Sequence, residues 1–279
     1  MGWLNYNGKI YKDDALLLGA DNRGLRYGDG LFETMKMKNG QLVLEDEHFA
    51  RLWKGMKILQ FTIPRHFNPD KLQEEIMQLT SRNQHQEAAR IRITVFRGNG
   101  GLYDATDHLP HYIIQTWLLP GSNGELNSNG LDIGIYSEVK KSCDLLSNLK
   151  TNNYLPYVMA ALKAKSEKWN DAVLINQYGR ICDSTIANIF IIKDEVIYTP
   201  ALSEGCIAGI IRNYLLNNLG QTGFTSCEKE ITIDELMNAD EVFLTNSIYN
   251  IRWVKSVDSK AFGNTIIQKI YAALVPTIL

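Results

Sequence analysis

Lys150 is the residue of this 279-residue sequence whose surroundings best suit covalent chemistry. It follows a polar turn at Ser147 and Asn148 and precedes a helical stretch that carries Tyr157 and Leu162. A lysine at such a junction can point into a cleft, where its amine loses a proton and can form a Schiff base. Taken alone, Lys150 is more simply a solvated charge beside a helix, so the other motifs decide its interpretation.

Two downstream segments carry residues that suit an anion such as a phosphate. The run 205–212 opens a helix with Gly205 and Gly209, and free N–H groups at a helix start attract anions. The polar turn Thr245-Asn246-Ser247 follows an apolar strand and can donate to the same group. Neither GxxxxGK[ST] nor GxGxxG occurs, which argues against a standard nucleotide site. Ordinary turn chemistry is the alternative for both segments.

Three arginines upstream and one aspartate downstream complete the candidate chemistry. Arg51 lies on an expected helix, where a guanidinium can bind a phosphate through two hydrogen bonds. Arg92 and Arg97 lie an odd number of residues apart, so a regular strand would point them to opposite faces. Arg97 precedes Gly98 and is placed to bind a substrate carboxylate, whereas Arg92 is expected to brace the core or an ion pair.

Asp183 supplies a carboxylate after the turn at Tyr178-Gly179. A carboxylate beside a pyridine nitrogen keeps that nitrogen protonated and makes the ring an electron sink. Read alone, Asp183-Ser184-Thr185 is more often a helix cap or a turn.

Composition excludes several classes of protein. The net charge is -2 and no Lys/Arg run occurs, which argues against nucleic acid as a partner. No apolar run approaches the roughly 18–20 residues of a membrane span, and the N-terminus does not resemble a signal peptide. A cytoplasmic protein is therefore expected. The four cysteines form no CxxC pair, so we expect free buried thiols and no metal site.

Hydrophobic periodicity predicts an α+β chain in two domains. Asn39-Gly40 is typical of a type I′ hairpin, and the Gly/Ser/Asn-rich segment 120–130 is typical of a linker. The expected domains are therefore 1–119 and 131–279. The expected strands are 89–96, 112–118, 131–136, 172–176, 188–192 and 241–244. The expected helices are 48–59, 70–79, 154–168, 207–219, 233–238 and 264–274. Gly220 is expected to close the helix 207–219.

The order of these pieces resembles the class IV aminotransferase family, the pyridoxal-phosphate enzymes of fold type IV. Its members include branched-chain and D-amino-acid aminotransferases and aminodeoxychorismate lyase. The resemblance runs from about residue 7 to about residue 254, through the motifs Tyr27-Gly28-Asp29-Gly30-Leu31-Phe32-Glu33, Arg51, Lys150, 205–212 and Thr245-Asn246-Ser247.

The resemblance implies a two-domain fold with the active site between the domains, pyridoxal 5'-phosphate as cofactor, and a homodimer. It assigns the catalytic role and the Schiff base to Lys150. It assigns cofactor binding to Arg51, Lys150, Asp183, Asn188, Gly209, Ile210, Ile211, Asn246 and Ser247. It assigns substrate binding to Phe32, Arg97 and Tyr154.

The implied activity is transfer of an amino group between an amino acid and a 2-oxo acid. One alternative is aminodeoxychorismate lyase, which releases pyruvate and p-aminobenzoate. The second alternative is a non-catalytic cofactor-binding protein, because Asp183 stands where the family usually has glutamate. Arg97-Gly98 and the glycine-rich helix start resemble the D-amino-acid and lyase branches, whereas Arg92 resembles the branched-chain enzymes.

Overall fold

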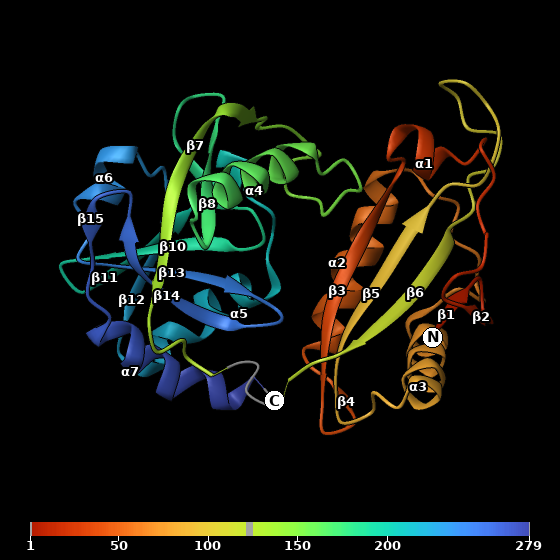
Figure 1. Cartoon of the computed structure of the whole chain (residues 1–279), viewed down its shortest axis with the longest axis horizontal. Coiled ribbons are helices and arrows are strands. Elements are labelled where there is room, and N and C mark those ends of the chain that lie inside the picture. The colour runs from red at the N-terminus through yellow and green to blue at the C-terminus, as the bar shows by residue number, and fades with distance from the viewer. Residues whose placement is uncertain (1, 121–124, 279) are drawn as a thin grey trace. The chain divides into compact units, whose positions relative to one another are not determined.

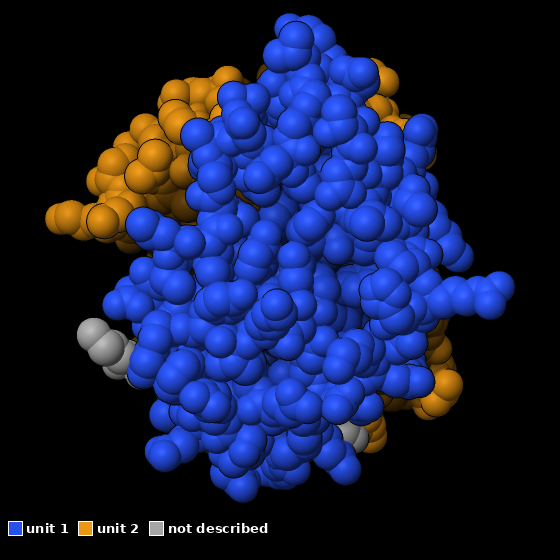
Figure 2. All heavy atoms as spheres, turned by 90° about the vertical axis from the view of Figure 1, so that its right-hand side faces the viewer, with its two compact units in different colours: residues 1–123, 150–153 blue, residues 124–149, 154–279 orange. Residues whose placement is uncertain are grey.

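A computed structural model describes residues 2–120 and 125–278 of the chain. The chain forms two compact units: unit 1 comprises residues 1–123 and 150–153, and unit 2 comprises residues 124–149 and 154–279. Figure 2 colours unit 1 blue and unit 2 orange. The division falls inside the expected linker, of which residues 121–124 lie outside the described part. The segment Lys150–Asn153, which the sequence places in the C-terminal domain, packs with unit 1.

Unit 1 is built on a six-stranded sheet, counted over the described residues, with two long helices packed on it (Figure 1). Neighbouring strands pair antiparallel. Across the sheet the strands are β2 (Lys9–Lys12), β1 (Trp3–Tyr6), β6 (His111–Leu118), β5 (Ala88–Phe96), β3 (Gly30–Lys38) and β4 (Gln41–Leu42). The helices are α1 (Arg23–Tyr27), α2 (Glu45–Ile58) and α3 (Pro69–Asn83).

Alternation along β3 explains how this sheet and α2 pack together. Met35 and Met37 point to one face and are fully buried against Leu52 and Met56 of α2. The expected hairpin follows β3, with positive φ angles of 50° at Asn39 and 76° at Gly40. The residues of β3 that alternate with this core are therefore available for the opposite face of the sheet.

Unit 2 contains a mixed sheet of nine strands among the described residues. In order these are β12 (Thr225–Lys229), β11 (Val196–Pro200), β10 (Asn188–Lys193), β13 (Glu241–Asn246), β14 (Asn250–Val257), β7 (Leu131–Lys141), β8 (Asp171–Asn176) and β9 (Ile181–Ser184), with β15 (Lys260–Ala261) beside β14. The helices are α4 (Leu155–Glu167), α5 (Ile210–Asn218), α6 (Ile233–Met237) and α7 (Thr265–Leu274), with short 3₁₀ turns η1 (Leu202–Glu204), η2 (Leu219–Thr222) and η3 (Val275–Thr277).

Helix α4 packs on the strands β7 and β8, which run parallel to each other. Its buried residues Tyr157, Ala160 and Ala164 contact Ala172 and Leu174 of β8 within one apolar cluster. The small alanine side chains allow the helix to lie close to the strands. This packing brings the Tyr157 hydroxyl to the ends of β7 and β9.

Several sequence expectations were wrong in detail. The turn at Tyr178-Gly179 leads into the short strand β9, which was not expected. Four residues are too few for a periodic pattern to predict a strand. Gly220 does not close α5, because the chain continues into η2 and the left-handed residue is Gly223, with φ of 83°. Of the cysteines expected to be buried, Cys182 and Cys206 are buried, whereas Cys143 is half-buried and Cys227 is exposed. Among the described residues, no helix has the length and apolar character needed to cross a bilayer.

Candidate functional site

Lys150 is held by backbone hydrogen bonds at the start of β3 in unit 1. Phe32 N donates to Lys150 O at 2.8 Å, and Asn152 N donates to Gly30 O at 3.0 Å. A Cβ on Gly30 would lie 2.0 Å from Val95 O, so only glycine fits there. The Lys150 ammonium lies 4.6 Å from the centroid of the Phe32 ring. The lysine is thus fixed by its main chain, with its side chain over an aromatic face.

Arg51 is oriented by the carboxylate of Glu33, a residue of the Tyr27–Glu33 motif that had no assigned role. Its Nε and Nη2 donate to the two oxygens of Glu33 at 2.7 and 2.6 Å. His48 Nδ1 lies 2.8 Å from Glu33 Oε2. Burial raises the pKa of Glu33, but Arg51 and His48 more than offset this and hold that pKa at about 2. Glu33 therefore stays ionised and fixes the plane of the guanidinium.

The two strand arginines have different surroundings. Arg97 is 9% exposed, forms an ion pair with Asp29, donates to Leu59 O and lies over the Phe61 ring. These contacts give it a structural task within unit 1, and its binding of a substrate carboxylate stays a prediction. Arg92 instead lies 3.7 Å from the centroid of the Phe32 ring. Phe32 therefore contacts both Arg92 and Lys150.

Asp183 is the centre of a buried polar cluster in unit 2. It is 2% exposed. Its Oδ1 accepts from Asn188 Nδ2 at 2.9 Å. Its Oδ2 accepts from Lys141 Nζ at 3.0 Å, from the Tyr157 hydroxyl at 2.9 Å and from Ile207 N at 3.0 Å. Burial lowers the pKa of Lys141, but Asp183 raises it further, so the net direction is upward. The Lys141 ammonium therefore keeps its charge beside the Asp183 carboxylate.

Asp171 fixes the turn that follows Asp183. Its Oδ1 accepts from Thr185 N at 3.0 Å and from the Thr185 hydroxyl at 2.6 Å, and its Oδ2 accepts from the Ser184 hydroxyl at 2.9 Å. The Asp183-Ser184-Thr185 turn that the sequence leaves ambiguous is therefore tied to the first residue of β8. Asp171 had no signal in sequence, because its role depends on the pairing of β8 with β9.

Asn188 connects this carboxylate to the start of α5. Its amide donates to Asp183 Oδ1 and also to Ile207 O at 2.8 Å. A Cβ on Gly209 would lie 1.9 Å from Asn188 Oδ1, so glycine is required at this close approach. Gly209 is the N-cap of α5 and supplies no side-chain cap to the first N–H groups, which include those of Ile210 and Ile211. Asn188 thus sets the spacing between Asp183 and a helix start that has no side-chain cap.

The expected polar turn lies at the end of β13, but its side chains differ in their bonding. Asn246 Oδ1 accepts from Ile248 N at 3.0 Å and from Tyr249 N at 2.9 Å, so it shapes the turn that contains Ser247. Within residues 2–120 and 125–278, the buried Thr245 hydroxyl has no hydrogen-bond partner. An orphaned buried hydroxyl is rare, and a bound ligand is one way to satisfy it.

Tyr154 stacks on Tyr157 with ring centroids 4.2 Å apart, and its hydroxyl donates to Thr185 O at 3.5 Å. It therefore lies beside the Asp183 cluster, to which Tyr157 belongs.

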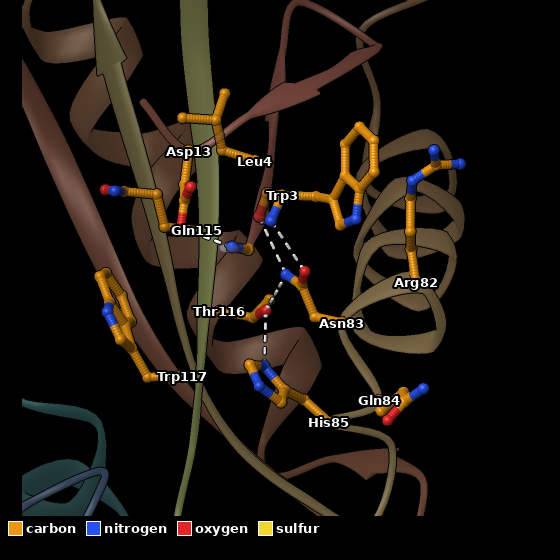
Figure 3. A pocket seen from close by; sticks show the side chains of 11 residues that line it. Trp3, Leu4, Asp13, Arg82, Asn83, Gln84, His85, Gln115, Thr116 and Trp117 are labelled. Atoms are coloured by element: carbon orange, nitrogen blue, oxygen red, sulfur yellow. Dashed lines mark hydrogen bonds between the residues drawn. The ribbon is translucent and has the colours of Figure 1, made fainter. Parts of the chain in front are cut away.

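A separate pocket of about 520 Å³ lies in unit 1, between β1, β6 and the end of α3 (Figure 3). Its lining includes Trp3, Asn83, His85 and Thr116 but none of the predicted site residues. Asn83 bridges the Trp3 backbone and the Thr116 hydroxyl, and His85 Nδ1 lies 2.9 Å from that hydroxyl. These polar groups bind one another, and we do not assign the pocket to the candidate site.

Sequence comparison decides the family. The model for amino-transferase class IV matches residues 30–257, which span every site residue discussed above. This chain belongs to the class IV aminotransferase family. It is therefore an enzyme of that class.

Curated relatives of this class IV enzyme carry two different activities in their names. D-alanine aminotransferase of Bacillus licheniformis is 28% identical over 98% of this chain and 96% of its own length. Aminodeoxychorismate lyase of Vibrio harveyi is 28% identical over 85% of this chain and 86% of its own length.

A solved structure supports the fold. Branched-chain aminotransferase from Thermoproteus uzoniensis, solved with norvaline, superimposes with a TM-score of 0.88, covering 99% of this chain and 94% of that one at 22% identity. The α+β, fold type IV architecture expected from the sequence is confirmed.

Proposed function

We propose that this class IV enzyme binds pyridoxal 5'-phosphate and transfers an amino group between an amino acid and a 2-oxo acid. The observation that carries the proposal is the Asp183 cluster joined through Asn188 to the start of α5. This cluster joins a buried carboxylate to a helix start without a side-chain cap, which supports the proposal. A phosphorylated pyridine needs both groups.

The donor set of the chain fits this cofactor. The α5 N-terminus supplies N–H groups and positive dipole for a phosphate, and the orphaned Thr245 hydroxyl is a buried polar atom that such a ligand would satisfy. In unit 1, Arg51, whose guanidinium Glu33 orients, supplies a cation suited to a phosphate. Asp183 supplies the charge that a protonated ring nitrogen requires.

When bound, pyridoxal 5'-phosphate supplies an aldehyde for covalent attachment and a ring that withdraws electrons from the substrate. Lys150 Nζ would hold the aldehyde, and its free amine would take the proton from the substrate Cα. The backbone bonds from Phe32 and Asn152 keep Lys150 in place during that transfer. Phe32 and Tyr154 are assigned to the walls of the substrate site by the family motifs they match.

The lyase reaction is the second candidate, and the relative from Vibrio harveyi supports it. Both reactions use a proton transfer at the substrate by Lys150. They differ in whether an amino group is handed on or a substituent is released. The residues named above serve either outcome, so substrate tests must separate them.

We propose a homodimer as the working form. Helix α4 exposes Leu155, Val158, Met159 and Leu162, at 73, 45, 43 and 57%. Their spacing places them on one face of the helix, and an apolar stripe of this kind marks a protein–protein contact. A second copy of the chain would cover it. A sedimentation measurement that finds only monomers at micromolar concentration would contradict this assignment.

The test of function is an absorption titration of the cofactor-loaded protein. L-leucine, L-glutamate, D-alanine and aminodeoxychorismate are added in turn while the band of the lysine-bound cofactor is followed. Loss of that band with one amino acid and its return with a 2-oxo acid establishes an aminotransferase and its stereochemistry. A band that persists with every amino acid, while aminodeoxychorismate yields p-aminobenzoate, establishes the lyase. A protein that takes up no cofactor refutes both.

A further inference from the structure

Lys141, at the end of β7, is a buried cation for which neither the sequence motifs nor the proposed reaction has a role. Its side chain is 7% exposed, and its Nζ lies 3.0 Å from Asp183 Oδ2. It also donates to the Tyr157 hydroxyl, which in turn donates to the same Asp183 oxygen. A lysine is seldom buried to this degree, and pairing is the condition under which it is tolerated.

The hydrogen bonds of Asp183 leave only one of its oxygens for a further donor. A carboxylate oxygen accepts about two hydrogen bonds. Oδ2 accepts hydrogen bonds from Lys141, Tyr157 and the Ile207 amide, so it has no capacity for a further donor. Oδ1 receives the Asn188 amide. An N–H group of a ligand would therefore donate to Oδ1. Lys141 favours this because it donates to Oδ2.

Within the part of the chain that the structure describes, Lys141 is the one cation that forms an ion pair with Asp183. Burial raises the pKa of the Tyr157 phenol and of the Cys182 thiol far above their usual range, and it raises the pKa of Cys206 to about 12. The other titratable groups that act on the cluster are Tyr154 and Cys143, together with Arg212 and Glu228, which act on Cys206 and form an ion pair with each other. A ligand therefore meets a neutral ion pair instead of an isolated negative charge.

We propose that Lys141 is a positioning residue that tunes Asp183 as the partner of a pyridine nitrogen. Its charge offsets that of the carboxylate, so the nitrogen holds its proton less tightly than it would beside Asp183 alone. Lys141 thereby sets the electron demand of the ring without touching the ligand. This inference rests on the proposed binding of pyridoxal 5'-phosphate.

The test uses protein loaded with pyridoxal phosphate that carries ¹⁵N in its ring, because the ¹⁵N chemical shift reports whether that nitrogen is protonated. The variants are Lys141→Met, which removes the charge, and Lys141→Arg, which keeps it. Lys163→Met is the matched control, since Lys163 also pairs with a carboxylate, Glu167 at 2.8 Å, but on the exposed face of α4. Cofactor affinity is measured for every variant.

Lys141→Met should raise the pH at which the ring nitrogen is half protonated by at least about one unit, a tenfold change in proton affinity. Lys141→Arg and Lys163→Met should leave that pH unchanged. If the methionine variant does not fold, Lys141→Gln retains a hydrogen bond to Asp183 without the charge and should give the same upward shift. An unchanged pH in a cofactor-loaded neutral variant overturns the inference and leaves the proposed function standing. A wild-type protein that binds no cofactor overturns the proposed function itself.

Discussion

Replacing Glu33 by glutamine should cost about 3 kcal/mol of unfolding free energy near pH 7. Glu33 is 1% exposed and is bound by Arg51 through two hydrogen bonds and by His48. These partners lower its pKa from 4.5 to about 2 against the opposing effect of burial. Because one pH unit is worth about 1.4 kcal/mol, the lowered pKa corresponds to about 3 kcal/mol.

The pH dependence of this stabilisation has a definite sign. The folded-state pKa of Glu33 lies below its ordinary value, so the stabilisation is fully present above about pH 4.5 and is lost as pH falls through about 2. At pH 3 about 1.4 kcal/mol should remain. Burial lowers the pKa of His48 more than Glu33 raises it, so His48 acts near pH 7 as a neutral hydrogen-bond donor. Arg51 therefore makes the larger ionic contribution to the lowered pKa of Glu33, especially near pH 7.

The assay is denaturant unfolding of Glu33→Gln beside Glu74→Gln at pH 7 and at pH 3. Glu74 lies on α3, is 59% exposed and pairs with Lys71 at 3.3 Å, so its replacement should cost less than about 0.5 kcal/mol. The reasoning is refuted if Glu33→Gln is within about 1 kcal/mol of Glu74→Gln at pH 7. It is also refuted if the difference between the two variants does not shrink at pH 3.

Two further substitutions test the anion-binding frame of unit 2. In a fluorescence titration, Gly209→Ala should weaken cofactor binding by at least about tenfold, because the new Cβ would lie 1.9 Å from Asn188 Oδ1. The control Gly220→Ala meets no atom within 4 Å and should leave cofactor binding unchanged. Thr245→Val should raise the stability of the cofactor-free protein by about 1 kcal/mol because it removes an orphaned hydroxyl, yet it should weaken cofactor binding. Thr199→Val, which loses a 2.8 Å bond to Ile189 O, should instead destabilise the protein by about 1 kcal/mol in thermal unfolding. Equal effects of the two valine substitutions on stability would contradict the account of Thr245.

Local periodicity was sufficient for the elements that carry Arg51 and Arg92. The alternation of β5, the apolar stripe of α2 and the Asn39-Gly40 turn all depend on neighbouring residues, and they formed close to where they were expected. The start of α5 was expected at residue 207 and lies at Ile210, because the chain first passes Asp183 at Ile207.

The Asp183 cluster could not be predicted in full because its partners meet through sheet register. Lys141 lies 42 residues from Asp183 in sequence, and only the pairing of β7 with β8 and of β8 with β9 brings them together. Tyr157 was expected within a helix, but its hydroxyl bond follows from how α4 packs on β8. Glu33 belongs to the Tyr27–Glu33 motif and His48 begins the helix expected over 48–59. Their contact depends on the packing of α2 on β3, which the sequence does not predict.

The most direct test of the central claim is to locate the cofactor's covalent attachment. The protein is loaded with pyridoxal 5'-phosphate, reduced with borohydride, digested and analysed by mass spectrometry, with Lys150→Ala and Lys163→Met treated in parallel. The account predicts that the reduced adduct lies on the peptide containing Lys150, persists in Lys163→Met and disappears in Lys150→Ala. An adduct on another lysine, or none in a protein that binds the cofactor, would contradict the assignment of Lys150.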